Sequence, residues 1–342
     1  MRVAMYYSNS DVRIEEMPVP EIGPREILMR VEASGICGTD VMEWYRADRV
    51  PLVLGHEVSG VIVKTGKGVR SYKEGDRIAA AHHVPCGVCR YCRRGHPTIC
   101  DTMRKTNFYP GGFAEYIRIP SINVERGTFL LPKNISYEEG TFIEPLACVI
   151  RAQRIAGVRK DDCVIMVGSG ISGMLHIHLA KVSGAARIVS TDIVDYRLKM
   201  ARSFGADEVI NAKEDIPKRL LEINKGMLAD VVIICTGSPD GIRQALRAVR
   251  RGGTVLFFAA TDQDVTMPFS VNDTFWRTEV TLASSYAGSP EEHEQALGMI
   301  KSGKVKVGEM ITHRLPLQEA LKGFQLVTGA KDSLKVIIQP QT

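Results

Sequence analysis

The sequence predicts a mixed α/β protein of two domains, a β-rich one at the amino terminus followed by a doubly wound parallel sheet. Its 342 residues exceed what a single hydrophobic core usually accommodates. Residues 1–120 contain short strand-like runs separated by Gly and Pro, which is typical of a distorted barrel or sandwich. From about residue 150, apolar strands alternate with helical stretches, the pattern of βαβ units in a parallel sheet.

We place the domain boundaries so that residues 1–148 form the β-rich domain and residues 149–288 the parallel sheet. In the second domain the strand-like runs are DCVIMVG, RIVSTD, EVI, DVVIICTG and TVLFFAA, with TEVTLASS as the sixth strand. Residues 289–342 turn helical at PEEHEQALGMIKSG and end on the strand-like SLKVIIQP. We expect this last segment to return and pack on the first domain.

Composition favours an ordinary globular enzyme. Apolar residues make up 44% and charged residues 24% of the chain, and the net charge of +5 is spread without a run of five basic residues. We therefore expect neither nucleic acid nor a membrane as a partner. The amino terminus lacks the apolar run of a signal peptide, and no apolar run approaches the roughly 20 residues that span a bilayer. A cytoplasmic protein is expected.

A glycine-rich run follows the first strand of the second domain. It reads Gly168-Ser169-Gly170-Ile171-Ser172-Gly173, comes directly after CVIMV and opens a predicted helix. The glycines allow a tight turn and close approach of the backbone to a pyrophosphate, whose charge a helix N-terminus favours. Asp192 follows nineteen positions after Gly173, where its carboxylate would accept ribose hydroxyls and repel a 2′-phosphate. The pattern predicts NAD rather than NADP; a plain tight turn, with Asp192 capping the next helix, is the alternative.

Four of the eight cysteines fall within fifteen residues, at Cys86, Cys89, Cys92 and Cys100. In a reducing compartment such a cluster is more often a metal site than a set of disulfides. Four thiolates at this spacing can close a tetrahedron around Zn²⁺ and leave no position for water, which defines a structural site. An iron–sulfur cluster uses similar ligands, and four unconnected thiols are the remaining alternative.

A second zinc site is indicated by residues that lie far apart along the chain. They are Cys37 in GICGTD, His56 and Glu57 in GHE, and Glu144 in IEPLA. Thiolate, imidazole and carboxylate groups suit Zn²⁺, and three protein ligands leave a position for substrate. An adjacent His-Glu pair is also common on exposed surfaces, so spacing alone leaves this open. The dinucleotide pattern favours zinc, because hydride transfer needs something that lowers the pKa of the alcohol.

Taken together, the motifs resemble those of the zinc-dependent medium-chain dehydrogenases. The shared order is GICGTD, GHE, GDR, the cysteine cluster, GGFAEY, EPLA, the glycine run and Asp192, and it extends from about Val12 to about Ile338. Glutamate rather than cysteine in EPLA makes the chain more similar to the sorbitol and L-threonine dehydrogenase branch than to simple alcohol dehydrogenases. The resemblance implies a GroES-like catalytic domain, a Rossmann coenzyme domain, and a homo-oligomer joined through the coenzyme domains, a tetramer rather than a dimer.

The resemblance also implies roles for single residues. Cys37, His56, Glu57 and Glu144 correspond to the catalytic-zinc residues, with the two glutamates able to exchange as ligand. The four clustered cysteines match the structural zinc, and Thr39 matches the hydroxyl that begins the proton relay. The residues expected to line the NAD site are Ile171 of the glycine run and, beyond the run, Asp192, Arg197, Phe258, Ala259, Ala260, Ser285 and Tyr286.

Two departures from the family pattern concern the substrate side. Met42 stands five residues after Cys37, where many relatives carry a histidine that passes the proton to solvent. A thioether cannot donate a proton, so the relay would end in water or use a neighbour such as Glu43. The stretch from Cys37 to His56, which shapes the pocket in the family, is shorter than in typical sorbitol and threonine enzymes.

The leading hypothesis is oxidation of a secondary hydroxyl of a polyol, sugar alcohol or sugar, with one catalytic and one structural Zn²⁺ per chain and NAD as cofactors. A small-molecule alcohol would be the partner. L-threonine 3-dehydrogenase is the alternative within the enzymes. A zinc-ribbon module with a redox-sensing NAD domain is the non-enzyme alternative, but it would not need the full set of Cys37, Thr39, His56, Glu57 and Glu144.

Overall fold

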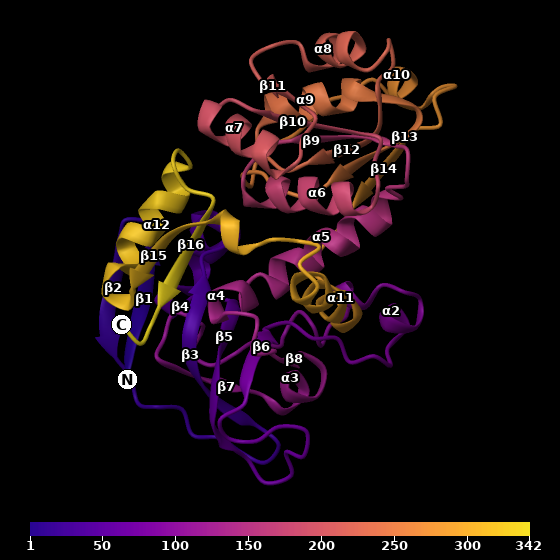
Figure 1. Cartoon of the computed structure of the whole chain (residues 1–342). Helices are drawn as coiled ribbons and strands as arrows, with labels where there is room; N and C mark the ends of the chain where they lie inside the picture. The colour runs from indigo at the N-terminus through magenta and orange to yellow at the C-terminus, as the bar shows by residue number, and fades with distance from the viewer. The chain divides into compact units, whose positions relative to one another are not determined.

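The computed structural model describes all 342 residues and divides them into two compact units. Unit 1 comprises Met1–Ala147 and Ala287–Thr342, and unit 2 comprises Cys148–Tyr286. These bounds lie within two residues of the boundaries expected from the sequence. The carboxy-terminal segment, yellow in Figure 1, thus belongs to the same unit as the amino terminus.

Unit 1 is built on two β-sheets. The smaller has the strand order β2-β1-β4, and the larger has the order β15-β16-β3-β5-β6-β8, with β7 also paired to β3. The strands are β1 (Arg2–Ser8), β2 (Asp11–Glu16), β3 (Ile27–Gly35), β4 (Leu52–Val53), β5 (Glu57–Thr65), β6 (Arg77–Ala81), β7 (Tyr116–Ile119), β8 (Thr128–Leu130), β15 (Ile311–Pro316) and β16 (Lys335–Gln339).

The carboxy-terminal strand β16 is a structural part of this sheet. Ile337 and Ile338 pair with Gly35 and Ser34 of β3, so the two ends of the chain share one ladder. The apolar core beneath includes the rings of Tyr6 and Phe113, which pack against Phe324 with centroids 5.3 and 5.7 Å apart. This pairing carries the first residue of β16 to the end of β3, directly before Cys37.

Most helices of unit 1 are short, and α11 and α12 are the longer ones. They are η1 (Gly38–Val41), α1 (Glu43–Arg46), η2 (Ala47–Arg49), α2 (Arg90–Arg93), η3 (Pro97–Ile99), α3 (Ser121–Arg126), α4 (Tyr137–Gly140), α11 (Pro290–Lys301), η4 (Gly308–Met310), η5 (Leu317–Glu319) and α12 (Ala320–Gly329). The longest helix of the protein, α5 (Ile143–Ala156), begins in unit 1 and continues into unit 2. No helix is long and apolar enough to cross a membrane.

Unit 2 is the predicted doubly wound sheet. Its six strands are parallel and have the order β11-β10-β9-β12-β13-β14, the 3-2-1-4-5-6 arrangement of a dinucleotide-binding fold. The helices α6 and α7 cover one face and α8 and α9 the other (Figure 1). The elements are β9 (Cys163–Val167), α6 (Ile171–Val182), β10 (Arg187–Asp192), α7 (Asp195–Phe204), β11 (Glu208–Asn211), α8 (Ile216–Ile223), β12 (Ala229–Ile234), α9 (Pro239–Ala248), β13 (Val249–Phe257), α10 (Val271–Phe275) and β14 (Thr281–Ser284).

Candidate active site

Three of the residues predicted to bind the catalytic zinc lie together in unit 1. Cys37 follows the end of β3, and His56 and Glu57 stand where β5 begins, so the pairing of Gly35 with Glu57 brings the two segments side by side. One ligand atom from each of Cys37, His56 and Glu57 lies within 4.8 Å of the others. A thiolate, an imidazole and a carboxylate at this separation fit Zn²⁺ with a position left for substrate.

The buried carboxylate of Asp40 orients this group. Its Oδ1 lies 3.3 Å from Nδ1 of His56, and its Oδ2 accepts the backbone N–H of Cys37 at 3.0 Å. Burial alone would raise the pKa of Asp40, but the neighbouring imidazole of His56 and the Cys37 N–H outweigh it and lower that pKa. An anionic Asp40 that holds Nδ1 leaves Nε2 of His56 for a metal, the usual arrangement behind a zinc-binding histidine.

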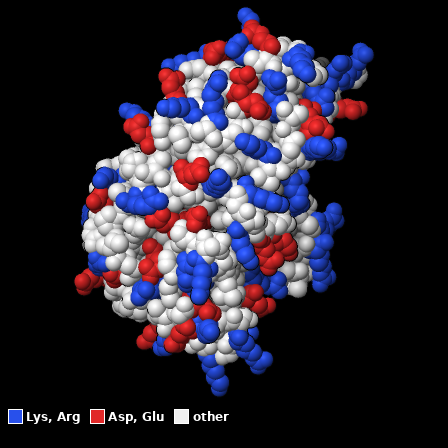
Figure 2. Space-filling view, viewed as in Figure 1, with Lys and Arg blue, Asp and Glu red and all other residues white.

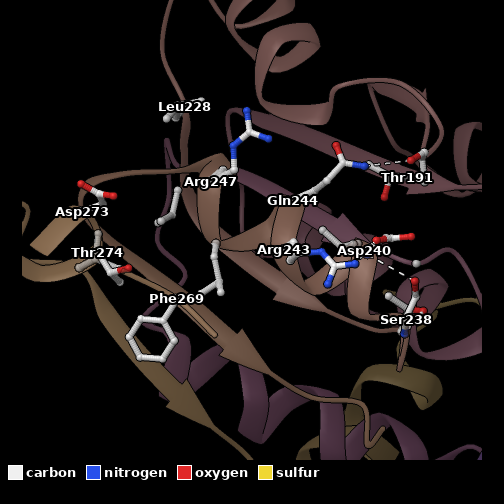
Figure 3. A pocket seen from close by; sticks show the side chains of 18 of the residues that line it. Thr191, Leu228, Ser238, Asp240, Arg243, Gln244, Arg247, Phe269, Asp273 and Thr274 are labelled. Atoms are coloured by element: carbon white, nitrogen blue, oxygen red, sulfur yellow. Dashed lines mark hydrogen bonds and ion pairs between the residues drawn. The ribbon is translucent and has the colours of Figure 1, made fainter. Parts of the chain in front are cut away.

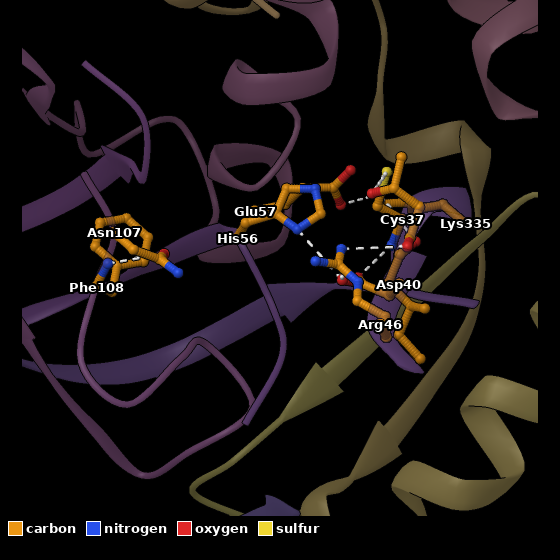
Figure 4. Close-up of polar contacts among 10 residues, drawn as sticks. Cys37, Asp40, Arg46, His56, Glu57, Asn107, Phe108 and Lys335 are labelled. Carbon is orange, nitrogen blue, oxygen red and sulfur yellow. Dashed lines mark hydrogen bonds and ion pairs between the residues drawn. The ribbon is translucent and has the colours of Figure 1, made fainter. Parts of the chain in front are cut away.

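Lys335 brings a positive charge to the zinc-binding group that no sequence pattern predicted. Its ammonium group forms an ion pair with Glu57 in which both side chains are only 1% exposed, and it donates to the carbonyl of Ile36 at 3.3 Å (Figure 4). A methyl group on Gly35 would collide with both partners, so glycine is needed at that position for the pair to fit. A lone lysine inside the apolar run SLKVIIQP was the available signal.

Arg46 and two further histidines surround the same group. The guanidinium of Arg46 lies beside Asp40 and His56 (Figure 4). The ring of His82 lies 4.7 Å from that of His56 and 3.8 Å from that of His83. Burial and the adjacent His83 keep the pKa of His82 well below its ordinary value. Nothing in the spacing of these residues along the chain pointed to this cluster.

Three further residues predicted to act in or near the active site, Thr39, Glu144 and Met42, lie outside the group of Cys37, His56 and Glu57. The hydroxyl of Thr39 is exposed and donates to Sγ of Cys37 at 3.4 Å, next to the zinc group as expected for a relay residue. Glu144, in the first turn of α5, is outside the group that Cys37, His56 and Glu57 form. Its part as a zinc ligand therefore stays a prediction. Met42 caps the end of η1 and is half-buried.

The four clustered cysteines form the second group, around α2 and η3. Their sulfurs all lie within 4.8 Å of one another, with Cys89 to Cys92 and Cys86 to Cys100 each at 3.6 Å. Zinc–sulfur bonds of about 2.3 Å in a tetrahedron place the sulfurs about 3.8 Å apart, so the cluster fits Zn²⁺. Burial opposes ionisation of Cys100, but the backbone N–H groups of Cys86 and Met103 lower its pKa to about 6.

The glycine run of unit 2 has the geometry that a pyrophosphate site needs. Gly168 has φ +108°, which favours glycine, and a methyl group on Gly173 would collide with the carbonyl of Gly168. Gly170 is the N-cap of α6, and Ile171 is its first residue, so the predicted helix begins where expected. Arg197 lies beside Gly170, and its Nε is buried without a hydrogen-bond partner.

Asp192 lies at the carboxyl end of β10 and borders a pocket of about 1230 Å³. Figure 3 shows this pocket and labels the preceding residue, Thr191. Its two oxygens accept the N–H groups of Ser169 at 2.9 Å and Val194 at 3.0 Å, and it is not the N-cap of α7. A carboxylate accepts about four hydrogen bonds, so capacity for ribose hydroxyls remains. The alternative that Asp192 only caps the next helix is thus not what the structure shows.

The other predicted coenzyme residues follow the carboxyl ends of neighbouring strands. Phe258 and Ala259 come after β13 and both donate to the carbonyl of Ile234, with Ala260 next in the chain. Ser285 and Tyr286 come after β14; the hydroxyl of Ser285 is buried without a partner, and Tyr286 is exposed. Ligands of such sheets bind along this edge. Contact between these residues and NAD remains a prediction.

Comparison with known proteins agrees with this geometry. The "Alcohol dehydrogenase GroES-like domain" family matches residues 23–127, and the "Zinc-binding dehydrogenase" family matches residues 172–302. The sorbitol dehydrogenase of Gallus gallus is 32% identical over 340 residues, covering 96% of this chain and 93% of the relative. The L-threonine 3-dehydrogenase of Bacillus licheniformis is 32% identical, covering 95% and 94%. The structure of galactitol-1-phosphate dehydrogenase from Escherichia coli has a TM-score of 0.87 at 26% identity, covering 99% and 100%.

The chain belongs to the zinc-dependent medium-chain dehydrogenases, with a GroES-like domain and a Rossmann domain, as the motifs predicted. Within that family it is a polyol-type dehydrogenase, an oxidoreductase that oxidises secondary alcohols with zinc and a nicotinamide dinucleotide. The predictions of enzyme class and of both cofactors are thereby confirmed.

Proposed function

We propose that this enzyme oxidises a secondary hydroxyl of a polyol, sugar alcohol or sugar to a ketone, with NAD rather than NADP as the hydride acceptor. The observation that carries the proposal is the gathering of the ligand atoms of Cys37, His56 and Glu57 within 4.8 Å of one another, because three protein ligands would leave a zinc ion one position for substrate. The names of similar proteins also include L-threonine 3-dehydrogenase, so threonine is the second candidate substrate.

The residues of the chain divide the work of this reaction. Cys37, His56 and Glu57 would hold the catalytic zinc, whose Lewis acidity makes the alcohol hydroxyl a stronger acid. Asp40 fixes the ring of His56, and the exposed hydroxyl of Thr39 accepts the proton that the alcohol loses and passes it on. Asp192 and the glycine run would hold the dinucleotide, whose nicotinamide would supply the acceptor for the hydride of the carbinol carbon.

A substrate panel tests the proposal directly. Purified enzyme loaded with zinc is mixed with NAD and one alcohol from a panel of neutral polyols (sorbitol, galactitol, an inositol), anionic polyols (gluconate, galactitol 1-phosphate) and L-threonine, and NADH is followed by its absorbance. We expect the highest kcat/KM for one of the polyols. Higher kcat/KM for threonine would establish the second candidate, and no reduction of NAD by any alcohol would favour a redox-sensing module.

Asp192 is expected to set the preference for NAD. Its carboxylate would face a 2′-phosphate and repel it. Asp192→Ala should therefore lower the ratio of kcat/KM with NAD to kcat/KM with NADP by about tenfold or more. Asp195→Ala, three residues away on the exposed first turn of α7, is the matched control and should leave the ratio unchanged. If the unmodified enzyme uses NADP as well as NAD, this role of Asp192 is wrong.

Glu144 is expected to contribute to turnover although it lies outside the zinc group. A carboxylate near a metal can exchange with water or substrate as coordination changes. Glu144→Gln, which keeps the volume and removes the charge, should lower kcat at least about tenfold, roughly 1.4 kcal/mol of barrier. NAD affinity, measured by fluorescence titration, should stay the same. Near-normal kcat would leave Glu144 without a catalytic role.

We also propose a cytoplasmic homotetramer with no macromolecular partner other than its own copies. An apolar, unpaired edge suited to a second copy is formed by the edge strand β14 and the neighbouring exposed side chains Phe269, Val271, Phe275 and Trp276.

Basic and acidic side chains are mixed on the face in Figure 2, which does not suit nucleic acid. The four-thiolate cluster needs reduced cysteines, which supports a reducing compartment. Light scattering measures the mass of the purified protein in solution, which should be that of four chains.

A further inference from the structure

Arg46 lies close to the zinc group without a full set of partners. It ends α1, in the stretch between Cys37 and His56 that shapes the substrate pocket in the family, and its side chain is 12% exposed. One guanidinium nitrogen donates to the carbonyl of Thr39 at 3.2 Å, and the group lies over the ring of Tyr45, 4.6 Å from the centroid. The Nε atom is buried and has no acceptor.

The positive charge of Arg46 is only partly matched by nearby carboxylates. The nearest is Asp40, whose Oδ1 is 3.9 Å away, beyond hydrogen-bond distance, and is engaged by His56. Glu43 at the start of the same helix instead accepts the N–H of Asn9 at 2.7 Å. Glu57 is paired with Lys335. An arginine held near a buried site with an open donor is well suited to a ligand anion.

The neighbouring histidines add to this character. The ring of His82 lies next to that of His56 and to that of His83, tilted against both, and Nδ1 of His82 is buried without a partner. An imidazole N–H can add an uncharged hydrogen-bond donor beside the guanidinium, but the positive charge that an anion would meet here is that of Arg46.

We propose that Arg46 selects alcohols that carry a negative charge, a carboxylate or a phosphate, and binds that anion through its guanidinium next to the zinc ligands. This inference rests on the proposed function and narrows its substrate class to anionic polyols. A guanidinium matches the two oxygens of either anion in bidentate fashion, so the structure names the shared chemistry, and the experiment separates the two sources.

The test compares neutral alcohols with anionic partners of the same carbon skeleton. Galactitol is paired with galactitol 1-phosphate for the phosphate, and sorbitol with gluconate for the carboxylate. For each, kcat and KM are measured by NADH absorbance, and equilibrium binding to the zinc-loaded enzyme is measured by calorimetry. We expect at least one anionic partner to have the lower KM and dissociation constant, by about 10- to 100-fold, the usual worth of a charged hydrogen bond.

Variants then connect this preference to Arg46. Arg46→Met should reduce the anionic-to-neutral ratio of kcat/KM at least about tenfold, mainly through KM, and Arg46→Lys should restore part of it. Arg49→Met is the matched control, because Arg49 lies over the same Tyr45 ring at 4.6 Å but donates only to the carbonyl of Tyr45. Its ratio should equal that of the unmodified enzyme. Zinc content is measured in every variant, since Arg46 also lies near Asp40.

The outcomes separate this inference from the proposed function. If the neutral polyols are oxidised with kcat/KM equal to or above that of their anionic partners, the inference is wrong and the proposed function stands. A ratio that Arg46→Met leaves unchanged would equally remove Arg46 from anion recognition. If neither kind of alcohol reduces NAD, the proposed function itself fails.

Discussion

Mild chelation of the purified enzyme is expected to abolish alcohol oxidation while about half of its zinc remains bound. The two metal groups differ in the way that determines lability. In the cysteine cluster four sulfurs surround the centre, and backbone N–H groups of Cys86 and Cys89 donate to the sulfurs of Cys100 and Cys86. The group around Cys37 would supply only three protein ligands, which would leave a position for water or a chelator.

Elemental analysis and activity, taken together before and after chelation, check this prediction. The untreated protein should contain two zinc ions per chain, and added Zn²⁺ should restore activity to the chelated protein. Cys37→Ser and Cys89→Ser form a matched pair, since each removes one thiolate from one group. The first should lose the labile zinc and all measurable turnover yet keep its fold, whereas the second should lose the other zinc and stability. One zinc or none in the untreated protein would contradict the assignment.

Replacing Lys335 by methionine is expected to destabilise the zinc-free protein by about 3–5 kcal/mol, because Glu57 is then left as a buried, unpaired charge. The ion pair is nearly inaccessible to water, and methionine keeps the length of the side chain while removing the charge. Bound zinc would neutralise the same carboxylate, so the loss should be smaller in the zinc-loaded protein. The difference in unfolding free energy with and without zinc therefore reports whether Glu57 faces the metal.

Urea unfolding of the single and double variants measures this effect. Glu57→Gln combined with Lys335→Met removes both charges and should recover much of the lost stability, as neighbouring charges are not additive. Lys331→Met, on an exposed lysine four residues earlier, is the control and should change the unfolding free energy by less than about 0.5 kcal/mol. Equal stability of the single and double variants would show that Glu57 is not charged, or not confined, in the folded protein.

Local sequence was sufficient for the features that depend on neighbouring residues. The glycine run directly follows β9 and opens α6 as predicted, because the turn needs glycine within a few residues of a strand end. The four cysteines are so close along the chain that a single folded loop brings their sulfurs together. The alternation of strands and helices likewise predicted the parallel sheet, since each βαβ unit is complete within a short stretch of sequence.

The assembly of the zinc group was predicted only through the resemblance, and its surroundings were not predicted at all. Asp40 was passed over although it lies three residues from Cys37, because its burial against His56 depends on how η1 folds over β5. Glu144 was expected among the ligands and lies outside their group, since its position depends on where α5 begins relative to β3 and β5. Neither the distance from Asp40 to His56 nor that from Glu144 to the three ligands follows from the spacing of these residues along the chain.

The sequence by itself determined the two domains, the dinucleotide turn, the cysteine cluster and the class of chemistry, each of which follows from residues close together or from an ordered set of motifs. Only the tertiary structure decided what faces the metal. Lys335 reaches Glu57 across 278 positions because β16 pairs with β3, and Arg46 and His82 come close to Asp40 and His56 from separate segments of the chain. Long-range strand pairing sets these contacts, and a strand's own residues do not reveal its partner.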